Sequence, residues 1–112
     1  VANTQPEPTE QRVREGGLFI DPERYEVRLD GKRLDLTPKE FELIKLMAGS
    51  KGRVWTREQL LDQVWGYDYF GETRTVDVHI RHLRQKLGDV GERFIKTVRG
   101  VGYHWVYRED ES

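Results

Sequence analysis

The segment from residue 73 to residue 87, TRTVDVHIRHLRQKL, most constrains how this chain of 112 residues can fold. On a helix at about 100° per residue, four apolar side chains of this segment fall within one narrow arc. They are Val76, Ile80, Leu83 and Leu87. An arc of this kind packs against a core, so the segment predicts a helix that lies on the surface of a small domain.

The opposite face of this predicted helix is basic and polar. It carries Arg74, Val78, Arg81, His82 and Gln85, flanked by Thr75, His79, Arg84 and Lys86, with Asp77 as the acid at its edge. Guanidinium forks and an exposed methyl group are the group types that contact guanine edges and thymine methyls in a major groove. A solvated charged face is the alternative interpretation. The helix alone leaves both open.

Charge is divided unevenly along the sequence. Residues 1–72 carry 11 basic and 14 acidic side chains, whereas residues 73–108 carry 8 basic and 3 acidic side chains. The acids Glu109, Asp110 and Glu111 then bring the whole chain to a net charge of −1. Basic charge therefore gathers in the last third of the chain, which favours a nucleic acid as partner.

Composition limits the chain to one small ordered domain. With 36% hydrophobic residues, it buries one modest core. The absence of cysteine excludes a disulfide framework and a thiolate metal site, and is compatible with a reducing compartment. No apolar run has the length of a membrane span or a signal peptide. We expect a cytoplasmic protein with no membrane partner.

Three regions are predicted along the chain. Residues 1–15 form a polar linker or disordered tail with two prolines, residues 16–108 form the domain, and residues 109–112 form an acidic tail. Because the chain lacks an initiator methionine, we expect a piece of a longer polypeptide. Short alternating runs between residues 18 and 36, with Asp30-Gly31 as a hairpin signal, predict a small antiparallel sheet.

Capping signatures predict where the helices begin. Thr37 caps a first helix, Pro38 suits its first position, Glu40 completes a capping box, and the helix ends near Gly49. The same pattern at Thr56 begins a second helix. Its inward residues are expected to be Leu60, Leu61, Val64 and Trp65. Thr73 is the expected cap of the basic helix.

The end of the domain reads as a basic β-hairpin. The runs FIKTV and YHWVY between residues 94 and 107 are joined by a glycine-containing turn with Arg99 at its tip. Three helices followed by a hairpin describe an α+β winged helix-turn-helix. In that arrangement one helix enters the major groove while the wing rests on the backbone or in the minor groove.

Four separated motifs resemble one family. LTPKEFELIKLM, TREQLLDQVWG, RTVDVHIRHLRQKL and IKTVRGVGY are similar to the OmpR/PhoB-type effector domains of bacterial two-component response regulators, over about residues 18 to 107. The resemblance implies an N-terminal four-stranded antiparallel sheet and sequence-specific binding to double-stranded promoter DNA that controls transcription. It also implies head-to-tail self-association on direct repeats, contact with RNA polymerase, and an N-terminal receiver domain that is missing from this chain.

The basic helix face and the resemblance together predict roles for single residues. Arg74, Thr75, Val78, Arg81, His82 and Gln85 are expected to read bases, and Trp65, His79, Arg84, Lys86, Thr97 and Arg99 to contact the backbone or minor groove. Tyr67, Asp68, Tyr69 and Phe70 are expected to form the polymerase-contact loop. Relatives often carry Arg where this chain has His82, so a contact there is expected to depend on pH.

Other functions have weaker support in the sequence. A winged-helix module that binds a protein through its basic face or through the aromatic loop over 66–72 is the alternative. His79 and His82 lie three apart, but no carboxylate or thiolate is placed to complete a metal site. No cysteine nucleophile or phosphate-binding glycine motif is present. We therefore expect neither a cofactor nor an enzyme.

Overall fold

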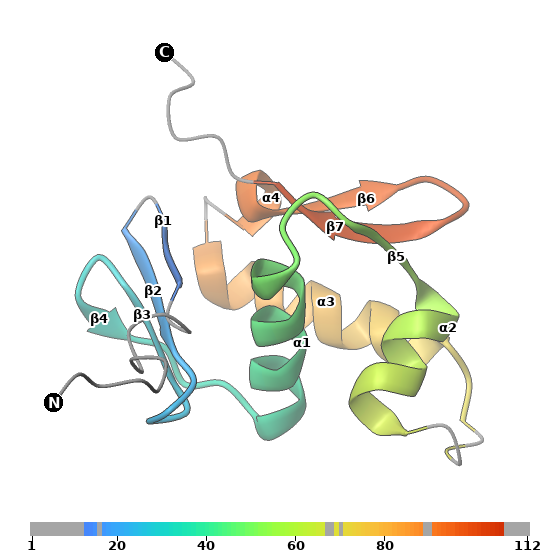
Figure 1. Cartoon of the computed structure of the whole chain (residues 1–112), viewed down its shortest axis with the longest axis horizontal. Coiled ribbons are helices and arrows are strands. Elements are labelled where there is room, and N and C mark those ends of the chain that lie inside the picture. Colours follow the sequence, from blue (N-terminus) through green and yellow to red (C-terminus); the bar gives the residue numbers. More distant parts are fainter. Residues whose placement is uncertain (1–12, 16, 67–68, 70, 89–90, 107–112) are drawn as a thin grey trace, which may run out of the picture.

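The computed structural model describes residues 13–15, 17–66, 69, 71–88 and 91–106 (Figure 1). Its elements in chain order are β1 (Val13–Glu15), β2 (Leu18–Asp21), β3 (Glu26–Leu29), β4 (Lys32–Arg33), α1 (Pro38–Gly49), β5 (Val54–Thr56), α2 (Arg57–Leu60), η2 (Leu61–Trp65), α3 (Arg74–Leu87), α4 (Gly91–Phe94), β6 (Ile95–Val98) and β7 (Gly102–Trp105). One sheet lies at the N-terminal end, a second sheet runs along another side, and the longer helices lie between them. Among the helices of the described residues, no candidate membrane span occurs.

The N-terminal sheet has four antiparallel strands in the order β1-β2-β3-β4, as the family resemblance predicts. Its last turn is the predicted hairpin, because Leu29 pairs with Lys32 across Asp30 and Gly31, which both have positive φ. The predicted linker over 1–15 is too long, since Val13–Glu15 form β1 against β2. Three residues show no period, and their strand conformation depends on pairing with β2. Residues 109–112, the predicted acidic tail, lie outside the described residues.

The predicted capping boxes of α1 and α2 are confirmed. Thr37 Oγ1 accepts from the Glu40 amide at 3.3 Å, and the Glu40 carboxylate accepts from the Thr37 amide at 3.0 Å. Thr56 and Gln59 repeat this exchange at the start of α2. Thr73 precedes α3, but its side chain caps nothing, so that prediction is wrong. Its helical φ of −65° and ψ of −14° replace the extended backbone that N-caps usually have.

Besides β1, two helical segments and one more strand differ from the sequence prediction. The second helix is a short α-helix, α2, that continues as a π-helical turn, η2, in which Leu61, Val64 and Trp65 are only partly buried. The four-residue helix α4 was not predicted, because it is too short to show a period. Nor was β5, which makes the wing a three-stranded sheet in the order β5-β7-β6 rather than a hairpin alone.

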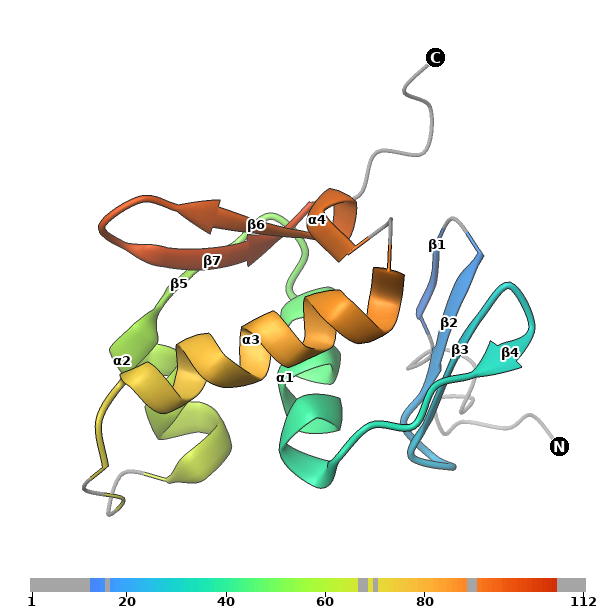
Figure 2. The ribbon, with the colours of Figure 1, turned by 180° about the vertical axis from the view of Figure 1, so that it is seen from behind.

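α3 packs into the core through the predicted arc. Val76, Ile80 and Leu83 are fully buried and Leu87 is 2% exposed. On the wing side, the rings of Phe94 and Trp105 stack with centroids 5.0 Å apart, and both side chains are fully buried. Figure 2 shows α3 lying across α1 with the wing sheet along one side. This packing fixes which sides of α3 are covered and which side is open.

Candidate nucleic-acid interface

α3 divides into four lengthwise stripes, because residues three and four apart share a face. The inner stripe is the buried arc. The outer stripe consists of Arg74, Val78, Arg81 and Gln85; the α1 stripe consists of Thr75, His79, His82 and Lys86; the wing stripe consists of Asp77 and Arg84. Each stripe has its own surroundings, and these surroundings separate the predicted site residues into groups.

The outer stripe is open to solvent along its whole length. All four side chains are exposed, and Val78 is 40% exposed. Among the described residues, no hydrogen bond or ion pair engages the side chains of Arg74, Arg81 or Gln85. Their donors are therefore available to a ligand without first breaking a contact within the chain, and the Val78 methyl groups lie beside them.

Two side chains of the α1 stripe, Lys86 and His82, lie against one buried carboxylate, Glu40. The Lys86 ammonium donates to Glu40 Oε1 at 2.6 Å and to the Asp35 carbonyl at 2.9 Å. His82 Nδ1 lies 3.8 Å from Glu40 Oε2. Glu40 is 2% exposed and also closes the cap of α1, so one side chain ties α3 to the start of α1. A phosphate contact by Lys86 would have to compete with this ion pair.

These partners lower the pKa of Glu40. Burial acts to raise it, but the hydrogen bonds from Lys86 and the Thr37 amide, with the charges of Lys86 and His79, outweigh burial and leave the pKa below the ordinary value of 4.5. A carboxylate whose pKa is lower in the folded state stabilises the fold above its unfolded pKa. That stabilisation is lost as the pH falls through the lower, folded pKa.

We therefore expect acid to weaken this contact in a defined pH range. We would measure the free energy of unfolding by urea denaturation from pH 7 down to pH 3. At pH values under 4.5, this free energy should decrease more steeply in the native chain than in Glu40→Gln. At pH 7 the Gln variant should lose about 2 kcal/mol, because it keeps an acceptor for Thr37 but not the charge that pairs with Lys86. Glu58→Gln, at an exposed carboxylate, is the matched control, and equal pH profiles for the two variants would contradict the assignment.

His79 and Trp65 meet at the N-terminal half of α3. His79 Nδ1 lies 2.7 Å from the Thr75 carbonyl oxygen, which only accepts, so Nδ1 carries the proton and Nε2 is left for another partner. The His79 ring contacts the Trp65 ring edge-on, with ring centroids 4.9 Å apart.

His79 and His82 have ring centroids 6.4 Å apart, and the described part of the chain contains no group of three metal-ligand residues.

Asp77, on the wing stripe, joins three elements. Its Oδ1 accepts from Arg57 Nε of α2 at 2.7 Å and from the Tyr103 hydroxyl of β7 at 2.6 Å. Burial, followed by the hydrogen bond to Asp77, raises the pKa of Tyr103, so the phenol stays protonated as the donor. The hydrogen bond to Asp77 raises the pKa of Arg57. The sequence places Asp77 at the edge of the basic face but does not show these partners.

Arg84, also on the wing stripe, fastens α3 to β6. Its guanidinium donates to the Ile95 carbonyl at 2.9 and 3.2 Å and to Thr97 Oγ1 at 2.8 Å. Thr97 is exposed, and Arg99 is exposed in the turn between β6 and β7. The structure thus brings three of the predicted backbone-contact residues to one side of α3, with Arg84 already engaged by the wing.

Of the predicted polymerase-contact loop, only Tyr69 can be placed. It is 39% exposed, and its ring lies 6.4 Å from the Trp65 ring. Tyr67, Asp68 and Phe70 lie outside the described residues.

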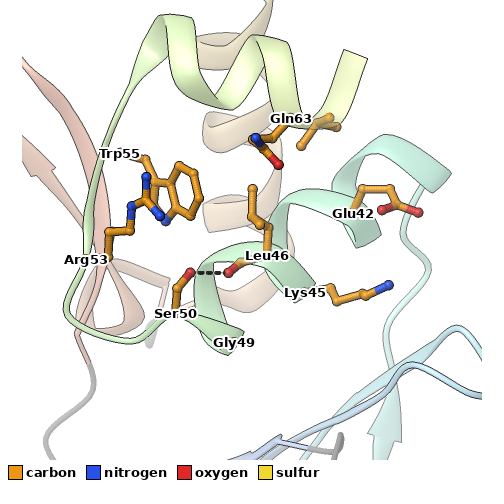
Figure 3. A pocket seen from close by; sticks show the side chains of 9 residues that line it. Glu42, Lys45, Leu46, Gly49, Ser50, Arg53, Trp55 and Gln63 are labelled. Atoms are coloured by element: carbon orange, nitrogen blue, oxygen red, sulfur yellow. Dashed lines mark hydrogen bonds between the residues drawn. The ribbon is translucent and has the colours of Figure 1, made fainter. Parts of the chain in front are cut away.

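A groove of about 540 Å³ opens on another side of α1 (Figure 3). Its walls are α1 from Glu42 onward, the connection to β5, and η2, with Leu46, Trp55 and Val64 among the lining residues. The Arg53 guanidinium lies 3.7 Å from the Trp55 ring centroid. In Figure 3 the ribbon of α3 lies behind α1, so this groove is separate from the outer stripe.

A helix held between a helical core and a β wing, with one open basic face, defines a winged-helix domain. The chain belongs to the OmpR/PhoB-type family described as "Transcriptional regulatory protein, C terminal", whose profile matches residues 31–105. The expected family and fold class are therefore confirmed.

Named relatives agree with this assignment. The chain is 46% identical over 102 residues to the phosphate regulon transcriptional regulatory protein PhoB of Pseudomonas aeruginosa, covering 91% of this chain and 44% of that protein. It is similar to the response regulator DrrB of Thermotoga maritima, an OmpR/PhoB homologue (TM-score 0.79, 38% identity, covering 86% of this chain and 44% of that chain). It is also similar to the Klebsiella pneumoniae RstA DNA-binding domain in complex with its RstA box (TM-score 0.75, 35% identity, covering 85% of this chain and 96% of that chain). The chain spans less than half the length of the curated relatives that it matches.

Proposed function

We propose that this domain binds double-stranded DNA at specific sequences and controls transcription as the effector domain of a two-component response regulator. The observation that carries the proposal is the outer stripe, a row of unpartnered donors and one exposed apolar side chain on a helix braced by a core and a wing. A helix with such a face fits a major groove. The similar RstA DNA-binding domain, solved in complex with the RstA box, supports DNA as the partner.

The stripes suggest a division of labour on DNA. The outer stripe contacts base edges in the major groove, and Arg81 lies near the centre of this stripe. Thr75 and His82, also predicted to read bases, lie on the neighbouring α1 stripe and meet the DNA at the margin of the groove. Trp65, Thr97 and Arg99 on neighbouring elements, and His79 on the α1 stripe, take the backbone or minor groove, whereas Arg84 and Lys86 mainly hold the helix in place.

Further partners follow from the family. We propose head-to-tail self-association on direct repeats, contact with RNA polymerase through the loop that contains Tyr69, a receiver domain joined to this domain in the whole protein, and a cytoplasmic location. Family membership supports these partners and this location, and the 39% exposure of Tyr69 makes it accessible to another protein.

Selection from a pool of random duplexes, at near-physiological salt, tests the DNA proposal. We expect enrichment of a short motif, with two direct copies about one helical turn apart. Affinity for the enriched duplex should fall steeply with salt, because each phosphate contact releases counterions. If no motif is enriched and no duplex binds in a salt-dependent way, the domain is not a DNA reader. A protein-interaction role for the basic face would then be the better proposal.

A further inference from the structure

We propose that Asp77 is a positioning residue that fixes the angle between α3 and the wing, and that this angle sets the preference for specific over random DNA. The inference rests on the proposed DNA binding. It assigns a role to the acid that stands at the edge of the basic face. Asp77 does not have to touch DNA for this role, because it acts through Arg57 and Tyr103.

A single oxygen atom of Asp77 links α3, α2 and β7. Both hydrogen bonds to Oδ1 are short and involve at least one charged group, which makes them stronger than neutral hydrogen bonds. Arg57 directly follows β5, and β5 pairs with β7. The three elements are therefore all connected to one another. α3 is hydrogen-bonded to α2 and to β7 through Asp77, and α2 is joined to β7 through β5, which precedes α2 in the chain and pairs with β7.

The wing contacts α2 and α3 through the side chain of Tyr103. Tyr103 is 5% exposed, and two guanidinium groups lie over its ring, that of Arg57 at 5.5 Å and that of Arg84 at 5.6 Å from the centroid. Arg84 also holds β6 through Ile95 and Thr97. The wing is thus fastened to α3 at two points, Asp77 in the first turn and Arg84 two turns later. Two separated fastenings prevent rotation of the wing about either one.

The angle matters because α3 and the wing are proposed to touch the DNA together. When the outer stripe lies against base edges, Thr97 and Arg99 reach phosphates only if the wing keeps its orientation to α3. Random DNA is held mainly by electrostatic contacts that tolerate readjustment. Loosening the wing should therefore weaken binding to the specific duplex more than binding to random duplexes.

Charge alone predicts a different result for this acid. Asp77 is 39% exposed on its side chain, next to a surface proposed to meet phosphates. If it acted only through its charge, Asp77→Asn would strengthen binding to all duplexes, since one repulsive charge is removed. If it positions the wing, the same variant should lower the ratio of specific to random affinity. The ratio therefore separates the two roles.

The sharpest test changes no charge. Tyr103→Phe removes only the hydroxyl that donates a hydrogen bond to Asp77. Tyr25→Phe is the matched control, because the Tyr25 hydroxyl donates a hydrogen bond to Glu42 of α1, away from Asp77. Affinities would be measured for the duplex enriched by the native chain and for a scrambled duplex of the same composition, at a temperature where all proteins are folded. Tyr103→Phe should bind the enriched duplex about fivefold more weakly and the scrambled duplex nearly as well as the native chain. Tyr25→Phe should change neither.

Each outcome has one meaning. If the native chain enriches no motif, the proposed function fails before the inference is tested. If the native chain enriches a motif and Tyr103→Phe keeps the native affinity ratio, the positioning role is overturned. Should Tyr103→Phe fail to fold, Arg57→Lys replaces it, because this variant keeps the charge and loses the Nε donor to Asp77. Arg57→Lys should then lower the same ratio, and an unchanged ratio overturns the inference.

Discussion

Replacing Gly102 with alanine is expected to lower the free energy of unfolding by about 3 kcal/mol, among the largest losses from a single methyl group in this domain. Gly102 begins β7 and pairs with Thr56 of β5. A Cβ atom at this position would lie 2.9 Å from the Thr56 Cα atom and closer still to the Trp55 carbonyl oxygen. These neighbours are backbone atoms, so they move only if β5 separates from β7.

Gly100→Ala is the matched control, because it places the same methyl group two residues away. Gly100 has a φ of +75° and no atom within 4 Å of a built Cβ, so the expected loss is only the strain of a left-handed backbone, about 1 kcal/mol. Thermal and urea denaturation of both variants measure the difference. Equal losses would mean that β5 does not lie as close to β7 as the structure places it.

Some elements could be predicted from the sequence because their causes lie within a few residues. The capping box of Thr37 and Glu40, the hairpin at Asp30-Gly31 and the apolar arc of α3 each depend on neighbours along the chain, and all three are confirmed. The exposed outer stripe follows from the same arc, since residues opposite a buried face are open to solvent.

Other elements depend on partners far away in the sequence. β5 becomes a strand because it pairs with β7, almost fifty residues later, and its three residues show no period of their own. The same holds for β1 against β2. The helical turn η2 continues a correctly capped helix, but nothing in its pattern distinguishes a π-helical turn from an α-helix.

The division of the basic face was also beyond sequence reasoning. Arg81, Arg84 and Lys86 are similar cations on one helix, and the sequence gives no reason to separate them. The structure separates them through distant partners: Lys86 meets Glu40, 46 positions earlier, and Arg84 meets Ile95 and Thr97. Glu40 is identifiable in the sequence as a helix cap, but its second role as the acceptor for α3 depends on tertiary packing.

Arg81→Ala should have the largest effect on sequence recognition. Arg81 is exposed near the middle of the outer stripe, and within the described residues its guanidinium has no hydrogen-bond or ion-pair partner. Its fork is therefore free to bind the O6 and N7 atoms of a guanine. Loss of such a contact should cost about 1 to 3 kcal/mol of binding free energy on the enriched duplex, with a much smaller loss on a scrambled one.

The base partner of Arg81 can be identified by changing protein and DNA together. In the native chain, replacing the contacted guanine should weaken binding about as much as Arg81→Ala does, whereas in the variant the same base change should have little further effect. Lys45→Ala is the control, since this exposed cation lines the groove on α1 and lies away from α3. Equal losses on enriched and scrambled duplexes would instead assign Arg81 to a phosphate, because a backbone contact carries no sequence information.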